Sequence, residues 1–327
     1  MTKANFPQPE LLAFTVRGDI VETLHEGWIC VLNHNKKVVY HKGRIEDKVF
    51  LRSSLKPIQA IPVADDDNKF EITSKELAVI SGSHSGSKKH TELLKKFLKK
   101  NAIQLSGLKC GTHLPLDEIE RNNLIRKKIL PSPLHNNCSG KHLGMLYVCK
   151  KKGWDPKTYL NRTHPLQKEI LNIIKKLSET KNISTATDGC GVPTFALPIT
   201  NIAKMFSNFT QSKNKNYHRI INAMINNPYF VGGKNQIDSE IMKASKKRLI
   251  AKVGAEGIIT VAYKGNSAVV KISDGSQKIR SFVILKLLKK LNWLKENEIK
   301  NSILENILKG EIKNHAGNTV GKIKVLL

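Results

Sequence analysis

The stretch Arg52-Ser53-Ser54-Leu55-Lys56-Pro57 decides how the rest of the chain is interpreted. The apolar run 49–51 precedes it and predicts a strand, and residues 58–62 continue it as a short helix. A helix brings residues i and i+3 to one side, so Lys56 is expected one turn from Ser53. Proline is compatible with a first helical turn. The stretch therefore predicts a strand-to-helix junction with a serine beside a lysine.

A serine three residues before a lysine is a pattern that can activate a nucleophile. The Ser53 hydroxyl needs a base to remove its proton, and Lys56 can be that base if burial or a nearby cation lowers its pKa. Free N–H groups at the start of the helix would stabilise an oxyanion. Taken alone, the pattern is better explained by an N-cap serine. The nucleophile hypothesis therefore depends on the rest of the chain.

Length and composition indicate a folded globular protein. The chain has 327 residues, of which 40% are hydrophobic and 25% charged. It contains no run of the roughly 20 apolar residues that a membrane helix needs. Residues 1–10 lack the apolar region of a secretory signal. Five cysteines are expected to be free thiols in a reducing compartment. We therefore expect a cytoplasmic protein that does not bind membranes.

The net charge of +28 raises the question of a nucleic-acid partner. The excess is mostly lysine, and it is spread along the chain on the polar faces of predicted helices. No RNA-binding or helix-turn-helix signature accompanies it. A nucleic-acid-binding protein is therefore the less favoured interpretation, although a basic surface can still attract an anionic partner.

The predicted elements indicate an α+β fold in a single domain covering residues 1–327. Apolar runs predict strands at both ends of the chain, within 12–51 and 252–294, and these ends are expected to complete one antiparallel sheet. Residues 53–250 are predicted to be mainly helical. The helical region is expected to face the sheet.

Two further motifs follow the first in an informative order. Ser83-His84-Ser85 lies in a small-residue loop after a predicted helix, and Lys252-Val253-Gly254 precedes a C-terminal strand. Ser-x-x-Lys, Ser-x-Ser and Lys-x-Gly, in this order, match the three motifs of penicillin-recognising serine hydrolases. In those enzymes the nucleophile, a second serine and a second lysine meet at one acyl carbon. The ordered set favours catalysis over a simple helix cap.

The finer resemblance is to the rhizobial-type L-asparaginases of the asparaginase II family, and it runs from about residue 14 to 275. The family has a fold similar to that of serine β-lactamases and glutaminases. The stretches that carry the resemblance are 17–25, 52–60, 82–85, 110–113, Asn136-Asn137-Cys138-Ser139-Gly140-Lys141-His142, Thr187-Asp188-Gly189-Cys190 and 252–255.

The resemblance implies a role for each motif residue. Ser53 would be the nucleophile that attacks the side-chain amide of L-asparagine, and Lys56 its base. Ser83 and Lys252 would form a second Ser–Lys pair that relays protons and keeps Lys56 partly neutral. Ser85 is the alternative for the second serine, and the Ser-His-Ser alignment favours Ser83.

Further site residues are implied by the same resemblance. Arg52 and Asp188 would contact the charged groups of the substrate, since a carboxylate matches Arg and an ammonium matches Asp. Cys138, Lys141 and Cys190 would form a zinc site. Thiolates suit zinc, but lysine is a rare ligand because its amine must first lose a proton. The spacing alone indicates only buried thiols and a solvated amine.

We therefore expect an amidohydrolase, an L-asparaginase that also forms the homodimer implied by the resemblance. Glutaminase, or another acyl-transfer enzyme on the same scaffold, is the alternative. A β-lactam-binding protein is less favoured because we find no export signal.

Overall fold

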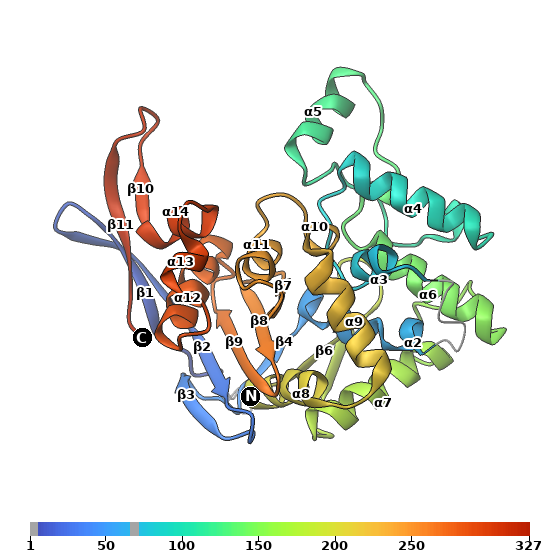
Figure 1. The fold of residues 1–327 in the computed structure, drawn as a ribbon, viewed down its shortest axis with the longest axis horizontal. Coiled ribbons are helices and arrows are strands. Elements are labelled where there is room, and N and C mark those ends of the chain that lie inside the picture. The colour runs from blue at the N-terminus through green and yellow to red at the C-terminus, as the bar shows by residue number, and fades with distance from the viewer. Residues whose placement is uncertain (1–5, 66–71) are drawn as a thin grey trace, which may run out of the picture.

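The computed structural model describes residues 6–65 and 72–327 and shows an α+β architecture (Figure 1). Residues 1–5, part of the stretch in which we found no secretory signal, lie outside it. The strands of the large sheet are β1 Glu10–Arg17, β2 Ile20–Leu32, β3 Val38–Lys42, β7 Ile250–Gly254, β8 Ile258–Tyr263, β9 Asn266–Ile272, β10 Glu311–Lys313 and β11 Thr319–Val325. They are ordered β10-β11-β1-β2-β9-β8-β7, and β3 also pairs with β2. The α+β class and the sheet shared by both chain ends are confirmed.

The middle of this sheet is covered on both faces. Residues Gly27–Leu32 of β2 pair antiparallel with Ser267–Ile272 of β9. β8 is buried from Ile258 to Ala262, whichever face its side chains point to. Such continuous burial requires elements on each side of the sheet. Helices α8 (Ile199–Gln211) and α12 (Gln277–Lys290) both pack against these strands.

The sheet extends further toward the C-terminus than predicted. The sequence indicated that the C-terminal part of the sheet lies within 252–294, but β10 and β11 add two strands beyond it. β11 pairs with β1, with Ala13 opposite Val325. Two short helices, α13 (Glu296–Ile299) and α14 (Ile303–Lys309), connect α12 to these strands.

A second, three-stranded sheet carries the predicted strand at 49–51. β4 (Lys48–Phe50) pairs with β6 (Pro193–Pro198), which in turn pairs with β5 (Ser184–Thr187). The prediction that residues 12–51 form one sheet was therefore wrong for this strand. The small sheet matters for function, because β4 leads directly into the Ser53 stretch and the β5–β6 turn contains Asp188 and Cys190.

The helical region is built around α6 (Ser139–Lys152), which is buried from Ser139 to Cys149. A Cβ atom at Gly140 would lie 2.4 Å from the backbone oxygen of Val79, so only glycine lets α6 approach α3 this closely. The other helices of this region are α1 Lys56–Gln59, α2 Ile61–Ala64, α3 Ser74–Ile80, α4 Lys88–Lys100, α5 Glu118–Arg126, α7 Pro165–Ser178, α9 Lys215–Asn226, α10 Pro228–Val231 and α11 Ile237–Ala244.

Within the described residues, each helix is too short or too polar to cross a lipid bilayer.

Candidate active site

The chain makes a strained turn at the start of the Ser53 stretch. After β4, Leu51 donates its N–H to Phe195 O (3.0 Å), and residues Arg52–Leu55 form a 3₁₀ turn that leads into α1. Arg52 has φ +47°, a left-handed conformation that costs a non-glycine residue about 1 kcal/mol or more. A strained backbone conformation persists only where surrounding contacts enforce it, and such residues cluster at functional sites. The junction is therefore a candidate part of a functional site.

The Lys56 side chain connects the first two motifs. It is fully buried, and its Nζ donates to Ser83 Oγ (2.9 Å) and to Asn137 O (3.0 Å). Among the described residues, nothing forms a hydrogen bond with the hydroxyl of Ser53, which is partly exposed. The structure thus brings Lys56 and Ser83 together, and leaves the Ser53 hydroxyl free for another partner.

The environment of Lys56 lowers its pKa below the ordinary value. Burial is the largest cause, and the charge of Lys141 acts in the same direction. The nearby Cys138 and Cys190 sulfurs act in the opposite direction and raise the pKa of Lys56. A buried lysine with a lowered pKa is a better proton acceptor than an exposed one.

Lys252 has a partner that sequence reasoning missed. Its Nζ lies 3.2 Å from Asp238 Oδ2, and both side chains are about 1% exposed. Lys252 also donates to its neighbour's carbonyl, Val253 O (2.9 Å), and no hydrogen bond joins it to Ser83. The structure therefore shows no hydrogen bond within the predicted Ser83–Lys252 pair. In sequence, Asp238 is only an acid in the first turn of a helix, a position usually explained by the helix dipole.

The pKa of Lys252 is lowered to about 8. Burial is the main cause, while the Asp238 carboxylate raises it and the charges of Lys56 and Arg280 lower it. The two buried lysines therefore influence each other's protonation, as expected for a coupled pair.

Arg52 and Asp188 form an ion pair beside the Ser53 stretch. Arg52 Nε donates to Asp188 Oδ1 (2.7 Å), and its Nη1 lies 3.8 Å from the mostly exposed Glu256 carboxylate. Burial raises the pKa of Asp188, but the charges of Lys141 and Arg52 outweigh it, so the pKa is lowered on balance. The pair presents a guanidinium and a carboxylate side by side.

Three further predicted site residues lie close together and are all buried: Cys138, Lys141 and Cys190. Lys141 Nζ lies 3.1 Å from Cys190 Sγ. The Cys190 thiol hydrogen-bonds to the Cys138 sulfur, which lowers the pKa of Cys138 well below its usual value, while the pKa of Cys190 is raised. Of the two thiols, that of Cys138 therefore loses its proton more readily.

This donor set fits a zinc ion in part. Zinc prefers sulfur ligands, and this site has two buried sulfurs. The thiol of Cys138 has a lowered pKa and therefore loses its proton readily. The pKa of Lys141 is raised, because the two sulfurs outweigh the effect of burial. Its amine would have to lose a proton on metal binding. No group of three or more His, Cys, Asp or Glu side chains suited to a metal occurs among the described residues.

The histidines near the site have structural partners. His84 Nε2 donates to Ser139 Oγ (2.9 Å) while Nδ1 accepts the Gly86 N–H (3.1 Å). Burial lowers the pKa of His84 far enough to keep it neutral. His113 Nε2 accepts the Asn137 N–H (3.1 Å) and thereby holds the loop whose carbonyl binds Lys56.

Ser83 and Ser85 have different surroundings. Ser83 contacts Lys56, as described above, whereas the Ser85 hydroxyl is buried without a hydrogen-bond partner. Of the two serines, Ser83 is the one that the structure places against the lysine.

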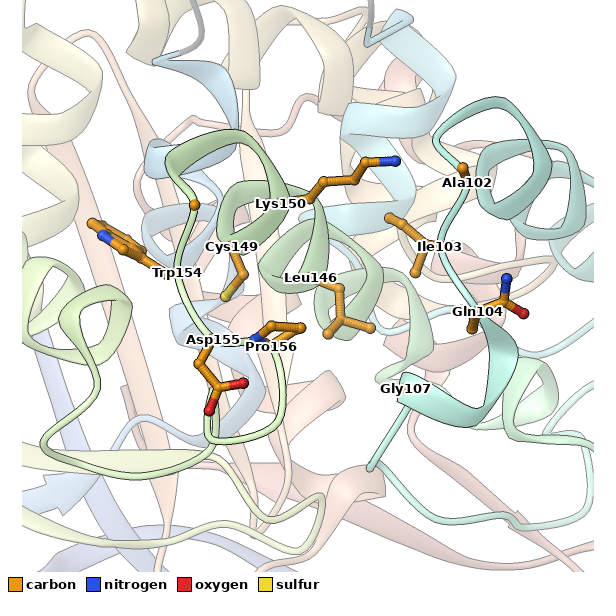
Figure 2. Close-up of a pocket in the computed structure, with 11 residues that line it drawn as sticks. Ala102, Ile103, Gln104, Gly107, Leu146, Cys149, Lys150, Trp154, Asp155 and Pro156 are labelled. Atoms are coloured by element: carbon orange, nitrogen blue, oxygen red, sulfur yellow. The ribbon is translucent and has the colours of Figure 1, made fainter.

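A cavity lies away from these residues. It has a volume of about 650 Å³ and is lined mainly by apolar groups of α6 and neighbouring loops, including Ile103, Leu146 and Trp154 (Figure 2). None of the predicted site residues lines it. Cys149 lies in its wall as a buried thiol whose pKa is raised to about 11, mainly by burial, consistent with a packed core cysteine.

The chain is similar to one known protein family in sequence and to solved structures in fold. Residues 13–325 match the family described as L-asparaginase II. No curated protein matches significantly by sequence. A β-lactamase from Mycobacterium bovis is similar in structure, with a TM-score of 0.45 and 11% identity over 82% of this chain and 95% of that one. A protein from Bacteroides dorei, assigned provisionally as a β-lactamase, gives a TM-score of 0.41 and 12% identity over 80% and 93%.

Proposed function

Because the chain belongs to the L-asparaginase II family, we propose that it hydrolyses L-asparagine to L-aspartate and ammonia through an ester on Ser53. The observation that carries this proposal is the buried Lys56 amine, which has a lowered pKa and sits at the meeting point of two serine motifs. The buried Lys56 amine is better explained by a role as proton acceptor in catalysis than by a role in stabilising the fold.

The first half-reaction is acyl transfer. Ser53 Oγ attacks the side-chain amide carbon of the substrate and passes its proton to Lys56, directly or through Ser83. The C–N bond then breaks as the nitrogen receives a proton from the same network and leaves as ammonia. The product is a β-aspartyl ester on Ser53.

The second half-reaction is hydrolysis of that ester. A water molecule attacks the ester carbon and gives its proton to the lysine network. Ser53 Oγ leaves and recovers a proton, which frees L-aspartate. Lys252, coupled to Lys56 by charge, favours the neutral form of that lysine.

Arg52 and Asp188 are proposed to select an α-amino acid. The guanidinium keeps Nη donors available for an α-carboxylate while its Nε is bonded to Asp188. The Asp188 carboxylate is held ionised and suits an α-ammonium group. The same pair would accept L-glutamine, which differs from L-asparagine by one methylene, so glutaminase activity is the alternative.

Zinc is proposed to be held by Cys138, Lys141 and Cys190. When bound, it would supply a fixed positive charge next to Asp188 and neutralise the two thiolates. Since Asp188 Oδ2 lies 3.9 Å from Cys190 Sγ, an ordered Cys190 would also keep this carboxylate in place for the substrate.

We also propose a cytoplasmic location and a homodimer. All five cysteines are free, which agrees with a reducing compartment. The proposal assigns no nucleic-acid partner, because the +28 charge is explained by lysines spread along the chain.

The proposal is tested by ammonia release from L-asparagine and, in parallel, from L-glutamine. We expect wild type to be active and Ser53→Ala to lose at least about 1,000-fold in kcat. Ser54→Ala is the matched control, since its buried hydroxyl only donates to Leu51 O (2.7 Å). Faster turnover of glutamine would keep the chemistry and change the substrate. Full activity of Ser53→Ala, or an inactive folded wild type, would contradict the proposal.

A further inference from the structure

The cavity beside α6 is a candidate ligand site that shares no lining residue with the proposed catalytic machinery. Its volume of about 650 Å³ lies within the range of roughly 300 to 1,000 Å³ that is typical of small-molecule sites. Figure 2 shows Leu146 of α6 between two loop walls. One wall contains Ile103 and Gln104, and the other contains Trp154 and Pro156. Apolar surface in contact with water costs free energy, which an apolar ligand recovers on binding.

The two charged residues of the lining already have hydrogen-bond partners. Lys150 Nζ donates to Asn101 O (2.7 Å). The Asp155 carboxylate accepts the Lys157 N–H (2.9 Å) and the Thr158 hydroxyl (2.9 Å). A charged ligand would have to compete with these bonds after losing its own hydration. The lining therefore selects an uncharged ligand.

Two neutral polar groups of the lining remain available to a ligand. Among the residues that the structure describes, neither the Gln104 side-chain amide nor the Trp154 indole N–H forms a hydrogen bond. Trp154 and Pro156 also supply flat faces against which a ring can pack. A peptide would bring an N–H and a C=O at each residue, and two side-chain groups cannot satisfy so many. The lining therefore fits a compact ring with one or two hydrogen-bonding groups better than a peptide.

We propose that this cavity is a binding site for a small, uncharged aromatic molecule. The ring would lie over Leu146 between the Ile103 and Trp154 walls. Its polar group would meet the Gln104 amide or the Trp154 indole N–H. Small-molecule sites generally combine apolar burial with a few placed polar groups in this way. The proposal does not depend on the reaction at Ser53.

The walls of the cavity continue toward the candidate active site. The wall that contains Trp154 leads to Tyr159, which is fully buried. The Tyr159 hydroxyl accepts the Lys109 N–H (3.0 Å) and hydrogen-bonds to His142 Nδ1 (2.6 Å). Lys109 in turn lies two residues after Gly107 of the opposite wall. Tyr159 thus joins both walls to the first turn of α6, so a ligand that orders the walls also orders these hydrogen bonds.

Gly107 allows the cavity to be filled without backbone strain. A Cβ atom at Gly107 would lie 3.5 Å from Leu146 Cδ1, which is an ordinary contact, and Gly107 does not adopt a positive φ. Gly107→Leu should therefore place its side chain in the cavity. Replacing this glycine should leave the melting temperature unchanged or raise it. Ser106→Leu is the matched control, because it adds the same side chain one residue away, outside the lining.

The first experiment titrates the protein with N-phenyl-1-naphthylamine, an uncharged aromatic amine whose fluorescence rises in apolar surroundings. We expect saturable binding of one probe per chain to wild type and to Ser106→Leu, with displacement by indole. Gly107→Leu should bind the probe at least about ten-fold more weakly. An absence of saturable binding to folded wild type would overturn the proposal, and so would equal binding to wild type and Gly107→Leu.

The second experiment tests the charge and the location of the ligand. Anilinonaphthalene sulfonate has the same rings with an added sulfonate, so it should not displace the uncharged probe from wild type. Probe binding should slow hydrogen exchange in the two walls, residues 102–109 and 153–159, of wild type and not of Gly107→Leu. Displacement by the sulfonate at similar affinity, or slower exchange confined to other segments, would overturn the assigned site. Both experiments omit substrate, so their outcome is separate from that of the asparaginase test.

Discussion

Lys252 and Asp238 form an ion pair, with 3.2 Å between Nζ and Oδ2, in which each side chain is about 1% exposed. Removing two charges from water is expensive, and their attraction offsets this only in part. Apolar residues would fill the same space at least as stably. The pair is therefore better explained by a functional requirement than by stability.

The first prediction concerns the pH dependence of activity. The Asp238 carboxylate raises the pKa of Lys252, whereas burial and the charges of Lys56 and Arg280 lower it, to about 8. Asp238→Asn removes the negative charge that stabilises protonated Lys252, so Lys252 should lose its proton at lower pH. We expect the limb of the kcat/KM profile near pH 8 to move to lower pH by about one unit or more.

The control for this variant is Asp19→Asn, at an exposed turn residue between β1 and β2. Its pH profile should equal that of wild type. A limb that stays at its wild-type position in folded Asp238→Asn would show that the carboxylate does not set the protonation of Lys252.

The second prediction concerns stability against pH. The pKa of Lys252 is 10.5 in the unfolded chain and about 8 in the folded one. Between these values the unfolded chain binds a proton that the folded chain lacks, so stability falls as pH decreases from 10.5 to 8. The effect is about 3 kcal/mol at most. Urea unfolding at pH 8 and pH 10 should show this dependence for wild type.

Replacing both partners should abolish that dependence. Lys252→Met with Asp238→Leu should be at least as stable as wild type at pH 8 and should have no activity. Lys252→Met alone leaves a buried carboxylate and should lose about 3 kcal/mol or more. A double variant that is less stable than the single one would contradict this account.

The third prediction separates strain from chemistry at Arg52. Arg52→Ala and Arg52→Gly both remove the guanidinium, so both should lose roughly 10- to 100-fold in kcat/KM, mainly through KM. Glycine adopts φ +47° freely and alanine does not. Arg52→Gly should therefore be about 1 kcal/mol more stable than Arg52→Ala in urea unfolding. Equal stability would show that the turn is not strained.

The fourth prediction distinguishes the two serines of the second motif. Ser83→Ala removes the hydroxyl that binds Lys56 and should lower kcat by roughly 100-fold or more. Ser85→Ala is the matched control, because its hydroxyl has no partner, and its kcat should stay within about three-fold of wild type. The reverse order of effects would transfer the role to Ser85.

The fifth prediction concerns the metal. We expect purified wild type to contain about one zinc ion per chain by elemental analysis, and Cys190→Ser to contain much less. Cys149→Ser, at a buried thiol in the cavity wall, should keep its zinc. Chelation should raise KM with a smaller change in kcat, and zinc binding should weaken at low pH because the thiols must release protons. Zinc-free wild type with full substrate affinity would rule out this role.

The sequence predicted local geometry better than distant pairing. Strong apolar runs such as 28–32 and 268–272 were placed in strands correctly, and the structure pairs them in β2 and β9. The run at 49–51 was also a strand, but its partner Pro193–Pro198 begins and ends with proline, which argues against a strand in sequence. β11, with lysines at 322 and 324, resembles exposed polar chain and was not predicted.

The site shows the same division. The spacing of Ser53 and Lys56 predicted that one helical turn joins them, and both lie in consecutive helical turns, Arg52–Leu55 and Lys56–Gln59. The pairing of their side chains stays a prediction, because the Lys56 amine binds Ser83. Lys56 and Ser83 meet only through the packing of α1 and the loop after α3, so spacing gave no indication of that contact. Asp238 reaches Lys252 from α11, which packs on β7. In the sequence, nothing distinguishes Asp238 from other acidic residues of helices, so its pairing with Lys252 could not be predicted before the fold was known.

The pairing of Ala13 with Val325 has a consequence for synthesis. β1 ends at Arg17, yet one of its two neighbours in the sheet, β11, begins at Thr319 and is therefore made about 300 residues later. At roughly 5 to 20 residues per second, that edge stays open for about 15 to 60 s. Contacts so distant along the chain also slow folding. During translation, β1 and β2 must therefore persist with an unpaired edge, the condition in which chaperones are most useful to a nascent chain.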